Sequence, residues 1–198
     1  MIELLTGVGA KVSNVSFIDF GGVIRPATGA KIQRIDRMGS RFKIGVSLPV
    51  GTASSKAALI ADLLAAKTEG LRINFPLQGV SQGSPGSCQV NGSGQSGTTL
   101  AIKNLTPGYS IEKGYWLSIA NTSGQHYLHN VTSGAVASGG GLATISIRPM
   151  LRHSFLNGAP ISISAPKIEG LIDGNEWSWQ QNVGGMIDGL AFTIEEAE

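Results

Sequence analysis

At 198 residues the chain is long enough for one large domain or two small ones, and its 41% hydrophobic residues are sufficient for a packed core. The 28 glycines are scattered rather than periodic, which excludes a collagen-like repeat, and charged residues make up only 14% of the chain. So low a charge content leaves much of the surface neutral, as in a subunit that buries its flanks against copies of itself.

The single cysteine and the lengths of the apolar segments indicate in which cellular compartment the protein is expected. Cys88 has no partner for an internal disulfide, and we expect a small, half-buried residue at the start of a strand rather than a functional thiol. The first residues lack the basic segment and apolar core of a signal peptide. No apolar run approaches the roughly 20 residues that a bilayer-spanning helix needs. We therefore expect a protein without membrane insertion that is made in the cytoplasm and stays there until something releases it.

Charge is distributed unevenly along the chain. Residues 1–43 carry Lys11, Arg25, Lys31, Arg34, Arg37, Arg41 and Lys43 against three acidic residues, whereas residues 168–198 carry only acidic ones: Glu169, Asp173, Glu176, Asp188, Glu195, Glu196 and Glu198. The two ends can pair within one fold or across neighbouring copies, and both arrangements stay open. A nucleic-acid patch is less favoured, because the basic residues are not interleaved with aromatic ones.

The first part of the chain predicts strands. Apolar and polar residues alternate over 13–20, and glycine and proline cluster in a predicted loop over 21–30. Residues 32–36 and 41–49 resemble the two arms of a hairpin with a turn at 38–40. This segment therefore predicts three strands, the last two paired with each other.

A helix is predicted over 54–67. Thr52 or Ser54 can cap its start, and Gly70 is placed to end it in a left-handed conformation. Its apolar residues recur at helical spacing and are Leu59, Ile60, Leu63 and Leu64. We expect this stripe to cover a sheet that includes the next predicted strand, 71–75.

The second part of the chain predicts a β-barrel or a small β-sandwich. A linker over 78–87 precedes a series of short strands separated by Gly, Asn and Ser clusters, namely 98–103, 115–120, 125–133, 142–148 and 160–165. Two further predicted strands, 176–180 and 189–195, are too few to form a sheet alone, so we expect them to complete the first sheet. The predicted fold is therefore mainly β, with 1–85 and 169–198 as one domain and 86–168 as an inserted one.

The sequence contains no recognisable catalytic constellation. His126 and His129 are expected to face opposite sides of one strand, which is a poor geometry for a shared metal, and His153 lies in a predicted connection. There is no nucleophile elbow, phosphate-binding loop or HExxH motif. We therefore expect no enzyme activity, no cofactor and no metal.

Four aromatic residues lie close together in the sequence, and they allow two interpretations. Tyr109, Tyr115, Trp116 and Tyr127 can form a stacking platform for a sugar or a single-stranded base. Alternatively, Trp116 and Tyr127 fill the barrel core or the seam between the two domains. The sequence favours the second interpretation without excluding the first.

Several segments of the second part of the chain carry a resemblance to known proteins: 90–97, 105–109 (Leu-Thr-Pro-Gly-Tyr), 114–119, 127–129, 147–152 (Ile-Arg-Pro-Met-Leu-Arg), 165–170 (Ala-Pro-Lys-Ile-Glu-Gly) and 190–196. They resemble the distal tail proteins of long non-contractile-tailed, siphovirus-type bacteriophages. The resemblance covers 88–198 well and 1–87 only by layout. It implies a β-sandwich ring domain with one helix and an inserted small OB-like β-barrel.

The resemblance also implies a structural role in the virion. Such proteins form a ring, usually a homohexamer, at the tail tip or baseplate, where they join the tail tube to the hub and fibre proteins while DNA passes through. For such a ring we infer interface charges at Arg34, Arg37, Arg41, Glu195 and Glu196. The alternative function is a carbohydrate-binding module that contacts host surface glycans through the four aromatic residues.

Overall fold

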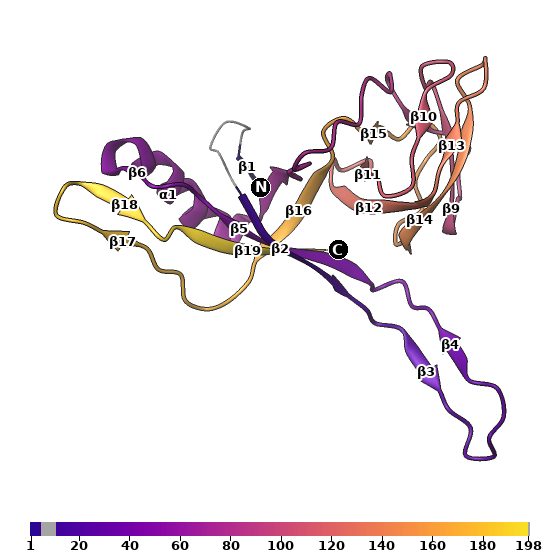
Figure 1. Ribbon diagram of the computed structural model, residues 1–198, viewed down its shortest axis with the longest axis horizontal. Helices are drawn as coiled ribbons and strands as arrows, with labels where there is room; N and C mark the ends of the chain where they lie inside the picture. The colour runs from indigo at the N-terminus through magenta and orange to yellow at the C-terminus, as the bar shows by residue number, and fades with distance from the viewer. Residues whose placement is uncertain (5–10, 198) are drawn as a thin grey trace.

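A computed structural model describes residues 1–4 and 11–197, and it is mainly β (Figure 1). One β unit carries the helix and holds both chain ends, a second forms a barrel, and a thin hairpin arm projects away from both (Figure 1). Within the described residues no helix has the length and apolar content needed to cross a bilayer.

The first unit is built on a six-stranded sheet. Its strands, in spatial order, are β1 (Ile2–Leu4), β7 (Leu71–Asn74), β16 (Lys167–Ile172), β19 (Ala191–Glu196), β5 (Arg41–Ser47) and β2 (Lys11–Ile18). Alternation along β5 buries Phe42, Ile44 and Val46 on one face of this sheet, whereas Lys43 is directed to the other. The expected return of the C-terminal segment to this sheet is thus present as β19.

Helix α1 (Ala53–Glu69) packs on the apolar face of the sheet. The Thr52 side chain accepts a hydrogen bond from the Ser55 amide at 3.3 Å, and Gly70 ends the helix with φ at 82°. The stripe is narrower than expected: Leu59 and Leu63 are buried, but Leu64 is 55% exposed. Beside the helix lies a small sheet of β17 (Gln180–Gln181), β18 (Met186–Asp188) and β6 (Gly51–Thr52).

Two predictions for the strands of this unit are wrong. The segment 32–36 does not pair with 41–49, because β5 pairs with β2 instead and sets Phe17 opposite Phe42. Residues between them form the arm, in which β3 (Gly22–Ile24) pairs with β4 (Gln33–Ile35). The predicted strand 176–180 is largely irregular, since the indoles of Trp177 and Trp179 pack against the core and the strand β17 starts only at residue 180.

The barrel is a six-stranded, nearly closed sheet. Its strands, in spatial order, are β15 (Ile161–Ser162), β11 (Trp116–Ala120), β12 (His126–Ser133), β14 (Ala143–Leu151), β9 (Gly97–Lys103) and β8 (Gln89–Val90), with a ribbon of β10 (Ser110–Ile111) and β13 (Ala135–Val136) beside them. A bridge from Gln89 to Pro160 joins its two edges. All its strands lie between 89 and 162, whereas the flanking strands β7 and β16 pair with each other in the first sheet.

Gly170 marks a close approach between β16 and β19. A Cβ added there would lie 1.8 Å from the carbonyl oxygen of Glu195. We expect Gly170→Ala to lower the free energy of unfolding by about 1–3 kcal/mol, because the strands must separate. Urea denaturation followed by circular dichroism measures this. Gly184→Ala is the matched control, since a Cβ at Gly184 meets nothing within 4 Å, and equal effects of the two substitutions would contradict the prediction.

Candidate functional site

Two of the inferred interface charges pair inside the chain. The Arg41 guanidinium donates from Nε and Nη2 to Oε1 of Glu195, at 2.8 and 2.6 Å, across the neighbouring strands β5 and β19. Lys43 makes an ion pair with Asp173 on the same face. For these residues the basic and acidic ends of the chain therefore meet within one fold, which is the first of the two arrangements that the sequence left open.

Glu196 is also unavailable to a neighbouring copy, because its side chain is fully buried. Its two carboxylate oxygens accept hydrogen bonds from the amides of Phe42 at 2.8 Å and Leu128 at 2.7 Å. The Nη2 atom of Arg152 lies 2.9 Å from Oε1 of Glu196. Burial raises the pKa of Glu196, and Arg152 and the two amides oppose that shift. We call Glu196 with these three partners the C-terminal clasp, and it joins the barrel to the first sheet.

Arg34 and Arg37 lie on the arm, which consists of the residues between β2 and β5. Arg34 pairs with Asp19 at 2.7 Å and with Asp36 at 2.8 Å, so its charge is compensated within the arm. The Arg34 guanidinium holds the pKa of the Asp19 carboxyl below its usual value. Arg37 makes no ion pair among the described residues and is exposed. Of the inferred interface charges, Arg37 alone remains uncompensated in this part of the chain.

The four aromatic residues do not form a platform. Tyr127 is buried in the barrel core, where its ring meets Phe155, and Tyr109 and Tyr115 pack against the same core. Burial raises the pKa of Tyr109 to about 12. Alternation along β11 directs Trp116 out of the barrel, and its ring packs against Phe42 and Phe75 in the seam between the two units. The second interpretation is therefore the one that the structure supports.

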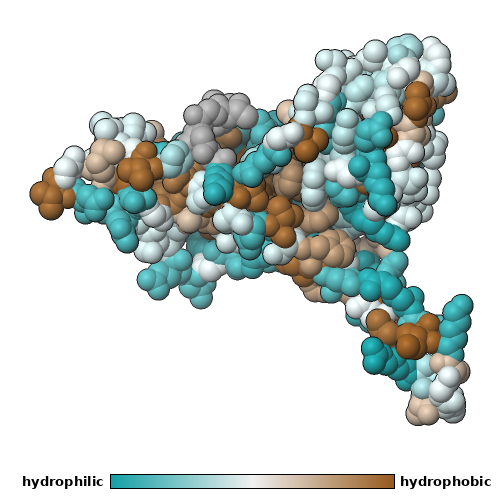
Figure 2. Space-filling model, viewed as in Figure 1, coloured by the Kyte–Doolittle hydropathy of each residue, from teal (hydrophilic) through white to brown (hydrophobic). Residues whose placement is uncertain are grey.

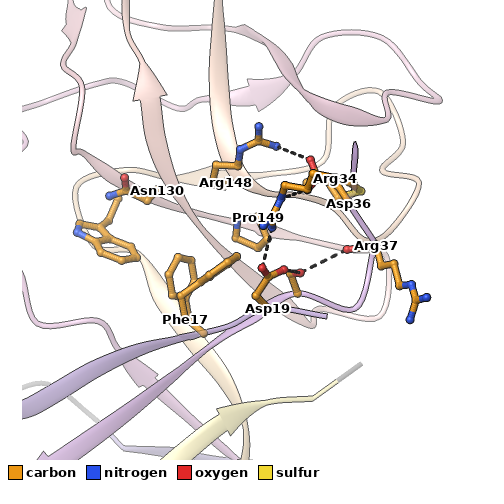
Figure 3. Close-up of a pocket in the computed structure, with 12 residues that line it drawn as sticks. Phe17, Asp19, Arg34, Asp36, Arg37, Asn130, Arg148 and Pro149 are labelled. Atoms are coloured by element: carbon orange, nitrogen blue, oxygen red, sulfur yellow. Dashed lines mark hydrogen bonds and ion pairs between the residues drawn. The ribbon is translucent and has the colours of Figure 1, made fainter. Parts of the chain in front are cut away.

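A cleft of about 600 Å³ lies at the root of the arm, where the first sheet, the arm and the barrel meet (Figure 3). Trp116 contributes to its aromatic floor and has its ring centroid 5.0 Å from that of Phe42. Seven of the lining residues matter below, three of them aromatic and four charged: Phe17, Phe42, Trp116, Asp19, Arg34, Asp36 and Arg148. Sequence reasoning missed this cleft because its walls come from segments that are distant in the chain.

The arm exposes an unusual number of large apolar side chains. They are Phe20, Val23, Ile24, Ile32, Ile35 and Met38, each between 43% and 57% exposed. Figure 2 shows brown apolar atoms on the projecting arm among hydrophilic ones. The arm has no layer of its own to cover these side chains, since it consists of two short strands and their turn.

Burial shifts the pKa of His126, His129 and Cys88. Burial lowers the pKa of His129 to about 3, and its Nδ1 lies 3.0 Å from the carbonyl oxygen of Pro149. Burial likewise lowers the pKa of His126 to about 4 and raises that of the Cys88 thiol to about 11. Within residues 1–4 and 11–197, no group of three His, Cys, Asp or Glu side chains is placed to hold a metal ion.

No protein-family model matches the chain, and no curated protein sequence matches it significantly. Its function is therefore inferred from its architecture and its surfaces.

Proposed function

We propose that the protein is a structural virion protein, a distal tail ring that joins the tail tube of a siphovirus-type phage to the hub and fibre proteins. Its resemblance implies that the ring is a homohexamer. Phage DNA passes through the ring during ejection. The resemblance over 88–198 supports this role, and so does the mainly β architecture with a nearly closed barrel inserted between two paired strands.

The exposed apolar arm is the observation that carries the proposal. A two-stranded hairpin is marginal in water, and contiguous exposed apolar side chains mark an interaction surface. The arm presents such side chains around Ile24 and Ile32, which are 48% and 57% exposed. A second copy of the chain is the partner that a ring requires, because each subunit then covers the arm of its neighbour.

The opposite end of the molecule offers a complementary surface. Figure 1 places the β17–β18 hairpin and the arm at opposite ends of the molecule. That hairpin exposes Val183 and lies in a segment whose charged residues are all acidic, among them Glu176 and Asp188, while the arm carries Arg25 and Lys31. Contact between two different flanks is heterologous, and such contacts close into a ring when the rotation permits. Charge and apolar area thus complement each other across the proposed interface.

Arm substitutions test the proposal. We expect the natural chain to form rings with an open centre, with a mass that is a multiple of 20.5 kDa, and the double variant Ile24→Asp with Ile32→Asp to remain monomeric. The charges oppose burial of the arm against a neighbour, whereas the fold is unaffected because both side chains are exposed. Light scattering and negative-stain imaging measure the outcome.

The matched control places the same charges on the barrel. Leu142→Asp with Leu156→Asp alters two side chains that are 48% and 57% exposed and lie outside the arm, and we expect rings to persist. A natural chain that stays monomeric at high concentration would count against the ring, and so would an arm variant that assembles normally. Circular dichroism of all variants confirms that they are folded.

A further inference from the structure

The cleft at the root of the arm has the dimensions and lining of a small-ligand site. Its volume of about 600 Å³ lies within the range of roughly 300–1,000 Å³ that is usual for such sites. Phe17 is 47% exposed, and its ring lies 5.5 Å from that of Phe42, so an aromatic surface faces the opening. Charged side chains stand around this floor (Figure 3).

Hydrogen-bond donors remain available in the cleft, whereas its carboxylates are occupied. Asp19 accepts from Arg34, from the amide of Gly21 and from Ser40, and Asp36 accepts from Arg34. Nη1 of Arg34 and both Nε and Nη2 of Arg148 make no hydrogen bond or ion pair within the described residues. A ligand that fits this cleft must therefore supply acceptors, and guanidinium groups favour acceptors that carry negative charge.

We propose that this cleft binds an acidic saccharide. The C–H face of a sugar ring stacks on Phe17 beside the edge of Trp116, and a carboxylate or phosphate on the sugar accepts hydrogen bonds from Arg148 and Arg34. This site differs from the four-residue platform considered from the sequence, of which only Trp116 lines the cleft. It goes beyond the ring role and does not depend on it, since one chain supplies every lining residue.

The site bridges two parts of the molecule. Arg148 belongs to β14 of the barrel and Asp36 to the arm, and Nη1 of Arg148 lies 3.8 Å from Oδ2 of Asp36 (Figure 3). An anionic group on the sugar competes with Asp36 for Arg148. Both charged side chains are about half exposed, so their ion pair adds little stability and is readily exchanged.

Calorimetric titration tests the site in the Ile24→Asp, Ile32→Asp background, where assembly does not compete. The probes are a tetrasaccharide of alternating glucuronate and N-acetylglucosamine, glucose 6-phosphate, neutral maltotetraose and inorganic phosphate. We expect one or both acidic sugars to bind at least about 10-fold more tightly than maltotetraose and inorganic phosphate, because only they combine a stacking face with an anion. Comparison of the two acidic sugars shows whether the anion is a carboxylate or a phosphate.

Substitutions locate the binding. We expect Arg148→Gln and Phe17→Ala each to weaken binding about 10-fold or more, whereas Arg25→Gln, which removes the same charge from the arm outside the cleft, leaves it unchanged. Failure of both acidic sugars to bind would overturn the proposal, as would equal binding of inorganic phosphate or maltotetraose. In the natural background, loss of rings on Phe17→Ala and Arg148→Gln without any sugar binding would identify the cleft as an interface between copies instead.

Discussion

Replacing Glu196 by alanine is expected to lower the free energy of unfolding by about 3–5 kcal/mol, because it leaves a buried guanidinium without its anion. The Arg152 side chain is only 1% exposed, and its guanidinium has no other hydrogen-bond partner among the described residues. The amides of Phe42 and Leu128 lose their acceptor at the same time. Urea denaturation followed by circular dichroism gives the difference.

Two further variants separate the clasp from a general effect of charge at the end of the chain. Glu195→Ala removes the adjacent carboxylate, whose partner Arg41 is partly exposed, and we expect a cost of only about 0–1 kcal/mol. Glu196→Leu combined with Arg152→Met replaces both charges by apolar side chains, and we expect it to recover much of the stability. If Glu195→Ala and Glu196→Ala lowered the free energy of unfolding equally, the buried pair of Glu196 and Arg152 would not stabilise the protein more than a partly exposed ion pair.

The C-terminal clasp is one of the contacts that hold the barrel on the first sheet. Leu128 is in β12 of the barrel, Phe42 is in β5 of the sheet, and one carboxylate accepts from both amides. Arg152 follows β14 and holds the same carboxylate from the barrel side. In the proposed ring, each subunit needs a defined angle between its two units if all copies are to close in register, and the clasp contributes to that angle.

Acidification from pH 7 to roughly 4.5 is expected to destabilise the protein by about 3 kcal/mol through His129 alone. Burial lowers the pKa of His129 to about 3 from an ordinary value of 6.5. When the pH lies between these two pKa values, His129 binds a proton in the unfolded chain but not in the folded chain. Stability is therefore fully present above pH 6.5 and is lost progressively as the pH falls towards 3.

His129→Gln isolates this contribution. The substitution removes the titrating imidazole, so the difference in unfolding free energy between pH 7 and roughly 4.5 is expected to shrink by about 3 kcal/mol, whatever the change in stability at pH 7. Chemical denaturation of both proteins at the two pH values measures it. Parallel pH profiles for the natural chain and the variant would rule out a buried neutral His129 as a source of acid sensitivity.

Local structure followed directly from the order of residues. The helix begins after Thr52 and ends at Gly70, as capping chemistry predicts. Alternation in the segment after the helix correctly predicted that Leu71 and Ile73 are buried. The strands of the barrel lie where Gly, Asn and Ser clusters delimit them. These features depend on hydrogen bonds and side-chain periodicity over a few residues, which a single sequence contains in full.

Tertiary structure decided which elements meet. Residues 32–36 and 41–49 have the pattern of a hairpin, but β5 pairs with β2, and the residues between these two strands form the arm. The same holds for the candidate site. Phe17 and Arg148 are far apart in sequence, so neither could be assigned to a common cleft from spacing alone.

The sequence by itself determined that this is a mainly β protein with one capped helix and a segment of short strands, since those properties arise from neighbouring residues. Only the tertiary structure determines whether a charged side chain is exposed to solvent or pairs with another residue of the same chain. Arg41 and Glu195 pair across adjacent strands, and Glu196 is buried against Arg152. The physical reason is that burial and pairing depend on distances between atoms, which sequence separation does not specify until the sheet and barrel have packed together.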